Sequence, residues 1–284
     1  MTIAEAAVAG VKTLVLGVAN RGGVIGESWM APIIEALEAG MDIASGLHVK
    51  ISDLPEIQAA AAANGRQLFD VRHSDQTFDV GTGARRAGKR MLAVGTDCSV
   101  GKMYTALAVE QELRQRGAKC DFRATGQTGI FIAGSGVSVD AVVSDFISGA
   151  TEWLAPANDP DHWDLVEGQG SLFHPSYAGV TMGLVHGAQP DALVLCHEPT
   201  RTHMRGLPHQ ALPDIAVCIE GHLGAARLTN PGARCVGIAV NTSAMDSGPA
   251  RADLLAGLSN TFGMPAVDPV LDGVAAIADA LEAL

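Results

Sequence analysis

The stretch Met91-Leu-Ala-Val-Gly95-Thr-Asp-Cys-Ser-Val-Gly101-Lys102-Met103 decides the fold. An apolar run ends at Gly95 in a turn of small residues, and Gly101 and Lys102 then open an amphipathic segment reaching about residue 116. This order is typical of a phosphate-binding loop, because glycine lets the backbone approach a phosphate and a helix start offers unpaired N–H donors. Lysine adds a positive charge. We therefore predict that this loop binds a phosphate group.

The loop departs in two ways from the common G-x-x-x-x-G-K-[ST] pattern. Five residues separate Gly95 from Gly101, and Met103 stands where a hydroxyl would bind Mg²⁺. A thioether is a poor ligand for a hard cation, and Tyr104 and Thr105 lie further round the helix. The departure favours a phosphate-bearing carrier such as coenzyme A over phosphoryl transfer. The alternative interpretation is a glycine turn that only joins a strand to a helix.

Composition favours an α/β enzyme of the cytoplasm. The 284 residues are 48% hydrophobic and 18% charged, and no apolar run approaches the roughly 20 residues of a membrane span. The net charge of −12 opposes nucleic-acid binding, so we expect neither nucleic acid nor membrane as a partner. Reduced thiols are expected, because the cysteines are odd in number and without paired spacing: Cys98, Cys120, Cys196, Cys218 and Cys235.

The first part of the chain has the pattern of a Rossmann-like unit. A β-α-β-α-β order is expected, with strands at 12–18, 41–45 and 67–71 and helices at 28–39 and 54–64. The turn Arg21-Gly22-Gly23 could hold an anion or be a plain loop. Residues 73–89 show no periodicity, so we place the boundary there and predict domains at 1–76 and 77–284.

The second domain repeats the alternation of strand and helix. Its expected strands are 90–95, 119–124, 162–167, 192–196 and 235–240, and its expected helices are 102–116, 138–154, 213–228 and one near the C-terminus. Polar, glycine-rich turns follow four of these strands, after Val94, Ala124, Val166 and Leu195. Ligands bind at the carboxyl ends of strands in an open parallel sheet, so these turns should converge on one crevice.

Two titratable residues lie at or just beyond the end of the strand expected at 162–167. Glu167 could hold a metal, act as a base, or cap the glycine-rich turn behind it. His174 could take a proton from an amine or be a hydrogen-bonded structural histidine. Several ligand-type side chains also lie in the stretch Cys196-His-Glu-Pro-Thr-Arg201-Thr-His203-Met-Arg205. Each of its two arginines could bind a carboxylate or phosphate. A solvated loop with internal salt bridges is the alternative there.

A metal site in that loop is disfavoured. Its ligands would be Cys196, His197, His203 and His209, and they lack the spacing of a Cys-x-x-Cys or His-x₃-His motif. We therefore assign no metal ligands.

Long motifs resemble a bacterial P-loop family that was long described as of unknown function and includes D-glutamate N-acetyltransferases. The matching stretches are Gly17–Gly23, Ser45–His48, Gly95–Met103, Ala124–Ile130, Val139–Gly149, Glu167–Pro175 and Cys196–Gly206. The resemblance implies a Rossmann-like N-terminal domain and a C-terminal parallel-sheet P-loop domain like that of dethiobiotin synthetase. It also implies acetyl transfer from acetyl-CoA to the amine of D-glutamate. Family members carry a further strand-bearing segment ahead of residue 1, so we expect the first domain to lack its first segment.

Site roles are assigned on position and chemistry. Lys102, Glu167 and His174 are the candidate catalytic residues, and Gln127, Thr128, Arg201, His203 and Arg205 the candidate substrate ligands. Backbone N–H groups of the turn at 126–129 could stabilise an oxyanion. The expected coenzyme-binding residues are Gly95, Thr96, Asp97, Cys98, Ser99, Val100, Gly101, Lys102 and Met103.

Other functions remain open from the sequence. A ligase of the dethiobiotin synthetase type would place a Mg-nucleotide at the loop, with Lys102, Asp97 and Glu167 serving it. A nucleotide-binding protein without turnover is a third interpretation. Small-molecule substrates and a homo-oligomeric state are expected for an enzyme of this class.

Overall fold

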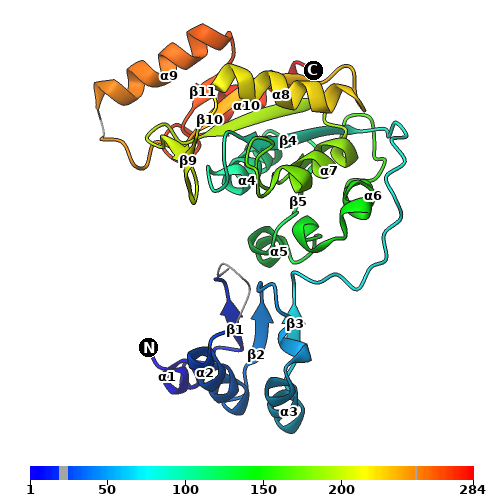
Figure 1. Cartoon of the computed structure of the whole chain (residues 1–284), viewed down its shortest axis with the longest axis vertical. Coiled ribbons are helices and arrows are strands. Elements are labelled where there is room, and N and C mark those ends of the chain that lie inside the picture. Colours follow the sequence, from blue (N-terminus) through cyan, green and yellow to red (C-terminus); the bar gives the residue numbers. More distant parts are fainter. Residues whose placement is uncertain (19–24, 247) are drawn as a thin grey trace. The chain divides into compact units, whose positions relative to one another are not determined.

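The structure, a computed structural model, describes residues 1–18, 25–246 and 248–284. The backbone forms two compact units (Figure 1). The first joins Met1–Thr77 to Gly126–Ala141, and the second holds Phe78–Thr125 and Val142–Leu284. The expected anion turn at 21–23 lies outside the described residues. The division of the chain at residue 76 stays a prediction.

A three-stranded parallel sheet in the order β1-β2-β3 forms the centre of the first unit. Alternating strands and helices build it as expected, and Ile33, Leu37, Ile43 and Ile57 fill its core. Its elements are α1 (Ile3–Val8), β1 (Thr13–Leu16), α2 (Glu27–Glu38), β2 (Asp42–Ser45), η1 (Ile51–Asp53), α3 (Pro55–Asn64), β3 (Leu68–Asp70), α5 (Gln127–Ala133) and η2 (Val139–Ala141).

The second unit is built on a six-stranded parallel sheet in the order β11-β10-β7-β4-β6-β5. A two-stranded antiparallel hairpin, β8-β9, is separate from it. The elements are β4 (Lys89–Gly95), α4 (Lys102–Gln115), β5 (Cys120–Arg123), η3 (Ser144–Phe146), α6 (Ile147–Leu154), β6 (Trp163–Val166), α7 (Ala178–Ala188), β7 (Ala192–His197), β8 (His203–Met204), β9 (Leu207–Ala211), α8 (Ile215–Arg227), β10 (Arg234–Val240), α9 (Pro249–Phe262), β11 (Ala266–Val267) and α10 (Ala275–Glu282).

Strand β4 shows why this sheet carries helices on both faces. Successive side chains of a strand point to opposite faces. Met91 and Ala93 pack in the cluster that includes α4 and α10, and Leu92 and Val94 pack in the cluster that includes α7 and α8. The continuous apolar run in the sequence therefore reflects burial on both sides, as is usual for parallel sheets.

The helix expected over 138–154 is wrong in its first part, because only Ile147–Leu154 is helical there, as α6. Two short 3₁₀ turns, η2 and η3, precede α6, and the chain passes from the first unit to the second between Ala141 and Val142. The apolar residues with helical spacing therefore belong to two separate units. The turn expected at 126–129 is also wrong in part, because Gln127 is the first residue of α5. The sequence analysis did not identify α1, α7, α9, β11 or the β8-β9 hairpin.

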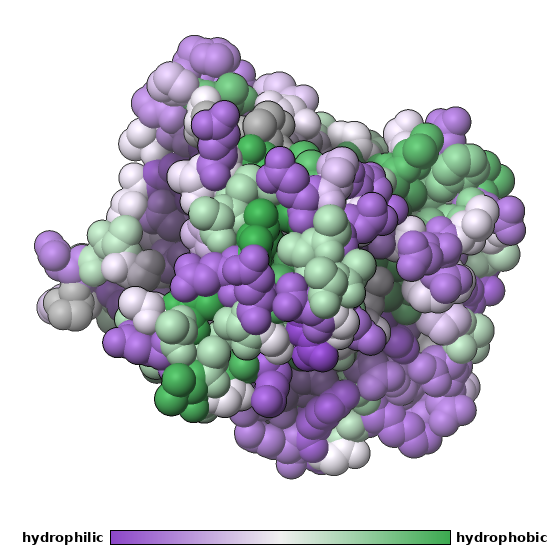
Figure 2. Space-filling model, turned by 90° about the horizontal axis from the view of Figure 1, so that it is seen from below, coloured by the Kyte–Doolittle hydropathy of each residue, from purple (hydrophilic) through white to green (hydrophobic). Residues whose placement is uncertain are grey.

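Hydrophilic residues predominate on the face drawn in Figure 2, and hydrophobic residues gather there in several small groups. In the part of the chain that the structure describes, no helix is both long and apolar enough to cross a membrane.

Candidate active site at the phosphate-binding loop

The carboxyl ends of four neighbouring strands bring the predicted loops together. Strands β7, β4, β6 and β5 lie side by side in one parallel sheet. The loop after β4 therefore lies next to the loops that follow β6 and β7 at one edge of the sheet.

The loop after β4 has the backbone of a phosphate cradle. Two residues have positive φ, Ser99 at 53° and Gly101 at 101°, and the second favours glycine because a side chain is strained there. The first turn of α4 has no side-chain hydrogen bond capping its N-terminus. Its N–H groups and the helix dipole suit an anion.

Lys102 supplies a buried positive charge beneath this backbone. Its Nζ donates to the carbonyl oxygen of Asp97 at 2.9 Å, and burial lowers the pKa of the ammonium. Its stem crosses Gly168, where a Cβ would lie 2.9 Å from Lys102 Cδ and 1.6 Å from the carbonyl oxygen of Ala93. A bound phosphate would compensate the desolvation of this ammonium, so the residues present fit a phosphate-bearing ligand.

Asp97 joins the phosphate-binding loop to the loop after β7. Its fully buried carboxylate accepts hydrogen bonds from the backbone N–H of Cys98 at 2.6 Å and of Arg205 at 2.7 Å. The guanidinium of Arg201 donates to it as well, at 2.7 Å. The buried charge is therefore paired and hydrogen-bonded, as burial of a carboxylate requires.

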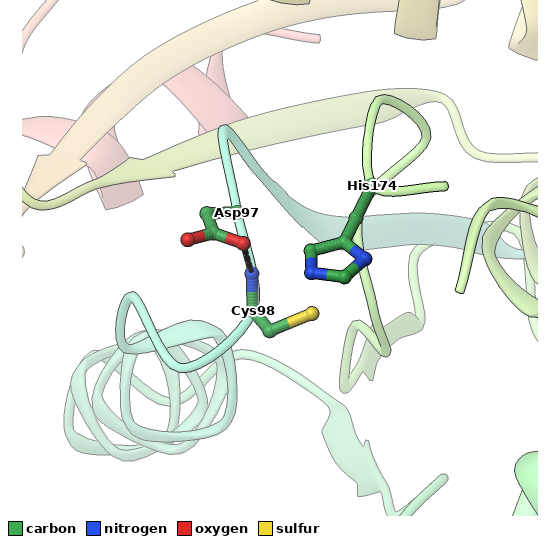
Figure 3. Close-up of side chains that lie close together, drawn as sticks. All are labelled: Asp97, Cys98 and His174. Atoms are coloured by element: carbon green, nitrogen blue, oxygen red, sulfur yellow. Dashed lines mark hydrogen bonds between the residues drawn. The ribbon is translucent and has the colours of Figure 1, made fainter. Parts of the chain in front are cut away.

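Asp97, Cys98 and His174 lie together in Figure 3, with one ligand-type atom from each within 4.8 Å of the others. The carboxylate is occupied by the three donors just described. The imidazole of His174 is also engaged at both nitrogens: Nδ1 accepts from the N–H of Ser176 at 3.2 Å, and Nε2 lies 3.2 Å from the carbonyl oxygen of Arg205. These hydrogen bonds link the loops after β4, β6 and β7 and leave the side chains poorly placed to coordinate a metal.

His174 is held in one orientation by these contacts. It is buried, and a proton on Nε2 satisfies both hydrogen bonds. Its ring also packs against Tyr177, with 4.7 Å between ring centroids. The geometry therefore supports the structural interpretation that the sequence left open.

Glu167 stands at the carboxyl end of β6 and is buried. Its Oε2 accepts from the backbone N–H of Thr125 at 2.9 Å, and the hydroxyl of Thr125 donates to the carbonyl oxygen of Glu167 at 2.6 Å. These contacts hold the ends of β5 and β6 together. They also fix the carboxylate at the edge of the sheet where ligands bind.

The two arginines after β7 differ in what they contact. Arg201 donates to Asp97, to the carbonyl oxygen of Cys98 at 2.7 Å and to that of Ser99 at 3.3 Å. The side chain of Arg205 is exposed and has no hydrogen-bond partner among the described residues. His203 is also exposed, with Nδ1 2.8 Å from the hydroxyl of Thr202. Arg201 therefore braces the loop, and the charge of Arg205 remains available to a ligand.

The position after Lys102 carries no hard ligand. Met103 is half-buried, and the hydroxyl of Thr105 donates to the carbonyl oxygen of Gly101 at 3.0 Å within the first turn of α4. Thr105 therefore does not replace the missing hydroxyl, in line with the sequence analysis.

Ser171 helps to shape the loop but was not singled out from the sequence, whereas Thr96 and His197 were named there for other roles. The hydroxyl of Ser171 donates to the carbonyl oxygen of Gly95 at 2.9 Å, and Thr96 Oγ1 lies 3.1 Å from Nδ1 of His197. Ser171 was part of the quoted motif after β6, which was the available signal. Gln127 and Thr128 open α5 in the first unit, one residue beyond Gly126.

Fold and loop together define a P-loop protein with a Rossmann-like first domain. Residues 1–74 match the family described as the DUF1611_N Rossmann-like domain of unknown function, and residues 79–278 match its companion, the DUF1611_C P-loop domain. The chain belongs to this DUF1611 family.

Relatives of known activity match nearly the whole chain. It is 55% identical to a D-glutamate N-acetyltransferase of Tritonibacter scottomollicae over 100% of this chain and 85% of that protein. It is 52% identical to a D-glutamate N-acetyltransferase of a Pseudoalteromonas species, over 97% of this chain and 83% of that protein. A crystal structure of a DUF1611 family protein from Anabaena variabilis is 34% identical, with a TM-score of 0.92 over 100% of this chain and 83% of that chain.

Proposed function

We propose that this protein is an acyltransferase that moves the acetyl group of acetyl-CoA to the amine of D-glutamate, giving N-acetyl-D-glutamate. The observation that carries the proposal is the likeness, over almost the entire chain, to two D-glutamate N-acetyltransferases at 52–55% identity. The loop supports it, because it keeps a phosphate cradle and lacks the hydroxyl of a magnesium site.

The loop 95–103 would bind a phosphate of coenzyme A. The backbone N–H groups at the start of α4 would donate to the phosphate oxygens, and the ammonium of Lys102 would neutralise their charge. Lys102 is buried, so this interaction is little weakened by water.

Arg205 and His203 would contact a carboxylate of D-glutamate. Both side chains are exposed on the same loop and hairpin, and the arginine has the forked geometry that suits a carboxylate. Arg201 would act through the loop by holding Asp97 in place. Gln127 and Thr128 are retained as further substrate ligands.

Glu167 is our choice for the base. The ammonium of D-glutamate must lose a proton before its nitrogen can attack the acetyl carbonyl carbon. Glu167 lies at the carboxyl edge of the sheet, and a carboxylate has about four acceptor positions, so the hydrogen bond from Thr125 does not use all of them. As the carbon–nitrogen bond forms, the carbon–sulfur bond of the thioester breaks, and the nitrogen loses a second proton. The departing thiolate takes up a proton, so that coenzyme A leaves as the free thiol. His174, whose two nitrogens are engaged, would position the loop.

An ATP-dependent ligase is the second candidate, since the loop could also hold a nucleotide phosphate. Met103 and the engaged hydroxyl of Thr105 disfavour the Mg²⁺ that such an enzyme needs.

The test measures thiol release from acetyl-CoA with D-glutamate, with L-glutamate and without an acceptor, and phosphate release in parallel with ATP and Mg²⁺. We expect thiol release that requires D-glutamate and persists in EDTA. Phosphate release with no thiol release would establish the ligase instead.

A further inference from the structure

Polar side chains that the proposed chemistry does not use lie at the carboxyl edge of the first unit's sheet. The motif Ser45–His48 begins at the last residue of β2, and Arg72 and His73 follow β3. In register, Ser45 pairs with Asp70, so the two strand ends lie side by side. This edge is where parallel sheets of the Rossmann type bind ligands.

Arg72 is the fixed member of this group. Its side chain is only 3% exposed, its Nε donates to the carbonyl oxygen of Gly46 at 2.9 Å, and its Nη1 pairs with Asp140. Asp140 also accepts from the hydroxyl of Ser138 at 2.8 Å. All these residues belong to the first unit. The guanidinium is therefore held in place by the turn after β2 on one side and by η2 on the other.

His48 is exposed and has no hydrogen-bond partner among the described residues. Partial desolvation lowers the pKa of its imidazole, and the charges of Arg72 and His73 lower it further. The carboxylate of Asp140 acts in the opposite direction. Nε2 of His73 is buried and, among the described residues, unpartnered. The imidazole of His48 therefore lies near enough to Arg72 to feel its charge, and Asp140 is already paired with that guanidinium.

Gln127, the first residue of α5, lies against Gly46 at the same edge of the sheet. A Cβ at Gly46 would lie 2.8 Å from Cγ of Gln127 and 3.2 Å from the ring of Phe131, so only glycine allows this approach. Within the described ranges the amide of Gln127 has no hydrogen-bond partner. The edge therefore gathers three side chains with uncommitted donors next to a fixed guanidinium.

We propose that His48, His73 and Gln127, backed by Arg72, form a carboxylate-binding site in the first unit. Imidazole and amide N–H groups donate to carboxylate oxygens, and hydrogen bonds to a charged group are the stronger kind. Its ligand is a carboxylate of the amino-acid substrate, and this identification rests on the proposed acetyl transfer to D-glutamate.

The first test is a kinetic comparison of the wild type with His48→Gln, His48→Ala and His73→Gln. His48 is exposed, so its replacement leaves the fold intact. We expect KM for D-glutamate to rise by about tenfold or more and KM for acetyl-CoA to stay within about twofold, because one charged hydrogen bond is lost from one substrate. Lys12→Gln, which removes an exposed cation elsewhere on the same unit, should change neither value. An unchanged KM for D-glutamate in both His48 variants would overturn the proposal.

A binding measurement separates this proposal from the proposed function. Glutarate, which cannot accept an acetyl group, is titrated calorimetrically into wild type and His48→Gln without acetyl-CoA. We expect weaker binding by about tenfold in the variant. If the wild type transfers no acetyl group but binds glutarate through His48, the site stands and the activity fails. If glutarate binds both equally, or not at all, the site is refuted.

Discussion

Asp97 accepts two of the hydrogen bonds that join the phosphate-binding loop to the loop after β7, one from Arg201 and one from the backbone N–H of Arg205. Its carboxylate is fully buried and depends on the guanidinium of Arg201 for a neutralising charge. Removing one member of a buried ion pair leaves the other charge uncompensated. At the scale of single residues, the stability of the loop therefore depends on Arg201 and hardly at all on Arg205.

Replacement of Arg201 tests this difference. Arg201→Ala should lower the free energy of unfolding by about 3 kcal/mol, because Asp97 is left buried without its partner. Arg205→Ala should change it by no more than about 0.5 kcal/mol, since its side chain is exposed. Urea denaturation followed by circular dichroism gives both values. Equal losses in the two variants would contradict the assigned roles.

Gly168 sets the contact between the end of β6 and the adjoining strand β4. Gly168→Ala should destabilise the protein by at least about 3 kcal/mol or prevent folding, because the new Cβ would lie 1.6 Å from the carbonyl oxygen of Ala93. Gly224→Ala is the matched control: a Cβ there meets nothing within 4 Å, and α8 should gain about 0.5–1 kcal/mol. Thermal melts of both variants measure the effect. A soluble Gly168→Ala protein melting like the wild type would refute the close contact.

Helix α8 carries a buried histidine that makes stability depend on pH. Burial lowers the pKa of His222 to about 4, from an ordinary value of 6.5. Below pH 6.5 the unfolded chain binds a proton that the folded chain does not, so folding stability falls as pH drops from about 6.5 to about 4. The slope contributed is up to about 1.4 kcal/mol per pH unit.

His222→Gln should remove that contribution. The free energy of unfolding is measured by urea denaturation at several pH values between 4 and 7.5. We expect a shallower decline in the variant, whatever its stability at pH 7.5. Parallel curves for the two proteins would show that His222 titrates alike in the folded and unfolded chains.

Helices and strands whose hydrophobic residues follow one clear pattern were predictable from the sequence. Elements that depend on close packing against another element were not. Strand β4 was predicted because its apolar run is continuous and ends at glycine. Helix α7 was missed because its glycines look like loop residues. A Cβ at Gly187 would lie 2.3 Å from the carbonyl oxygen of Ser148, and one at Gly183 would lie 2.7 Å from Ile147. These glycines let α6 and α7 approach closely.

In the candidate site, too, features set by adjacent residues were predictable and features set by distant residues were not. The backbone of the loop 95–103 could be predicted, because its turn and the start of α4 depend on adjacent residues. The commitment of Arg201 to Asp97 and of His174 to Arg205 could not, because each pairing joins residues far apart in the chain. Sequence spacing shows which side chains are available to a ligand only after such internal partners are known.

At the scale of the whole molecule, each of the two units presents the carboxyl edge of a parallel sheet, and each edge carries charged side chains. The loop of the second unit has the features of a phosphate site, with Lys102 at its centre. The edge of the first unit has the features of a carboxylate site, with His48 and Arg72.

The most direct test of the account measures steady-state thiol release from acetyl-CoA with D-glutamate for the wild type and Lys102→Met, which keeps the apolar stem and removes the charge. We predict that kcat/KM for acetyl-CoA falls by about 100-fold in the variant, the loss of a charged hydrogen bond of roughly 2.7 kcal/mol. KM for D-glutamate should stay within about threefold, and circular dichroism should show an unchanged fold. A variant as active as the wild type would remove the phosphate-binding loop from the reaction.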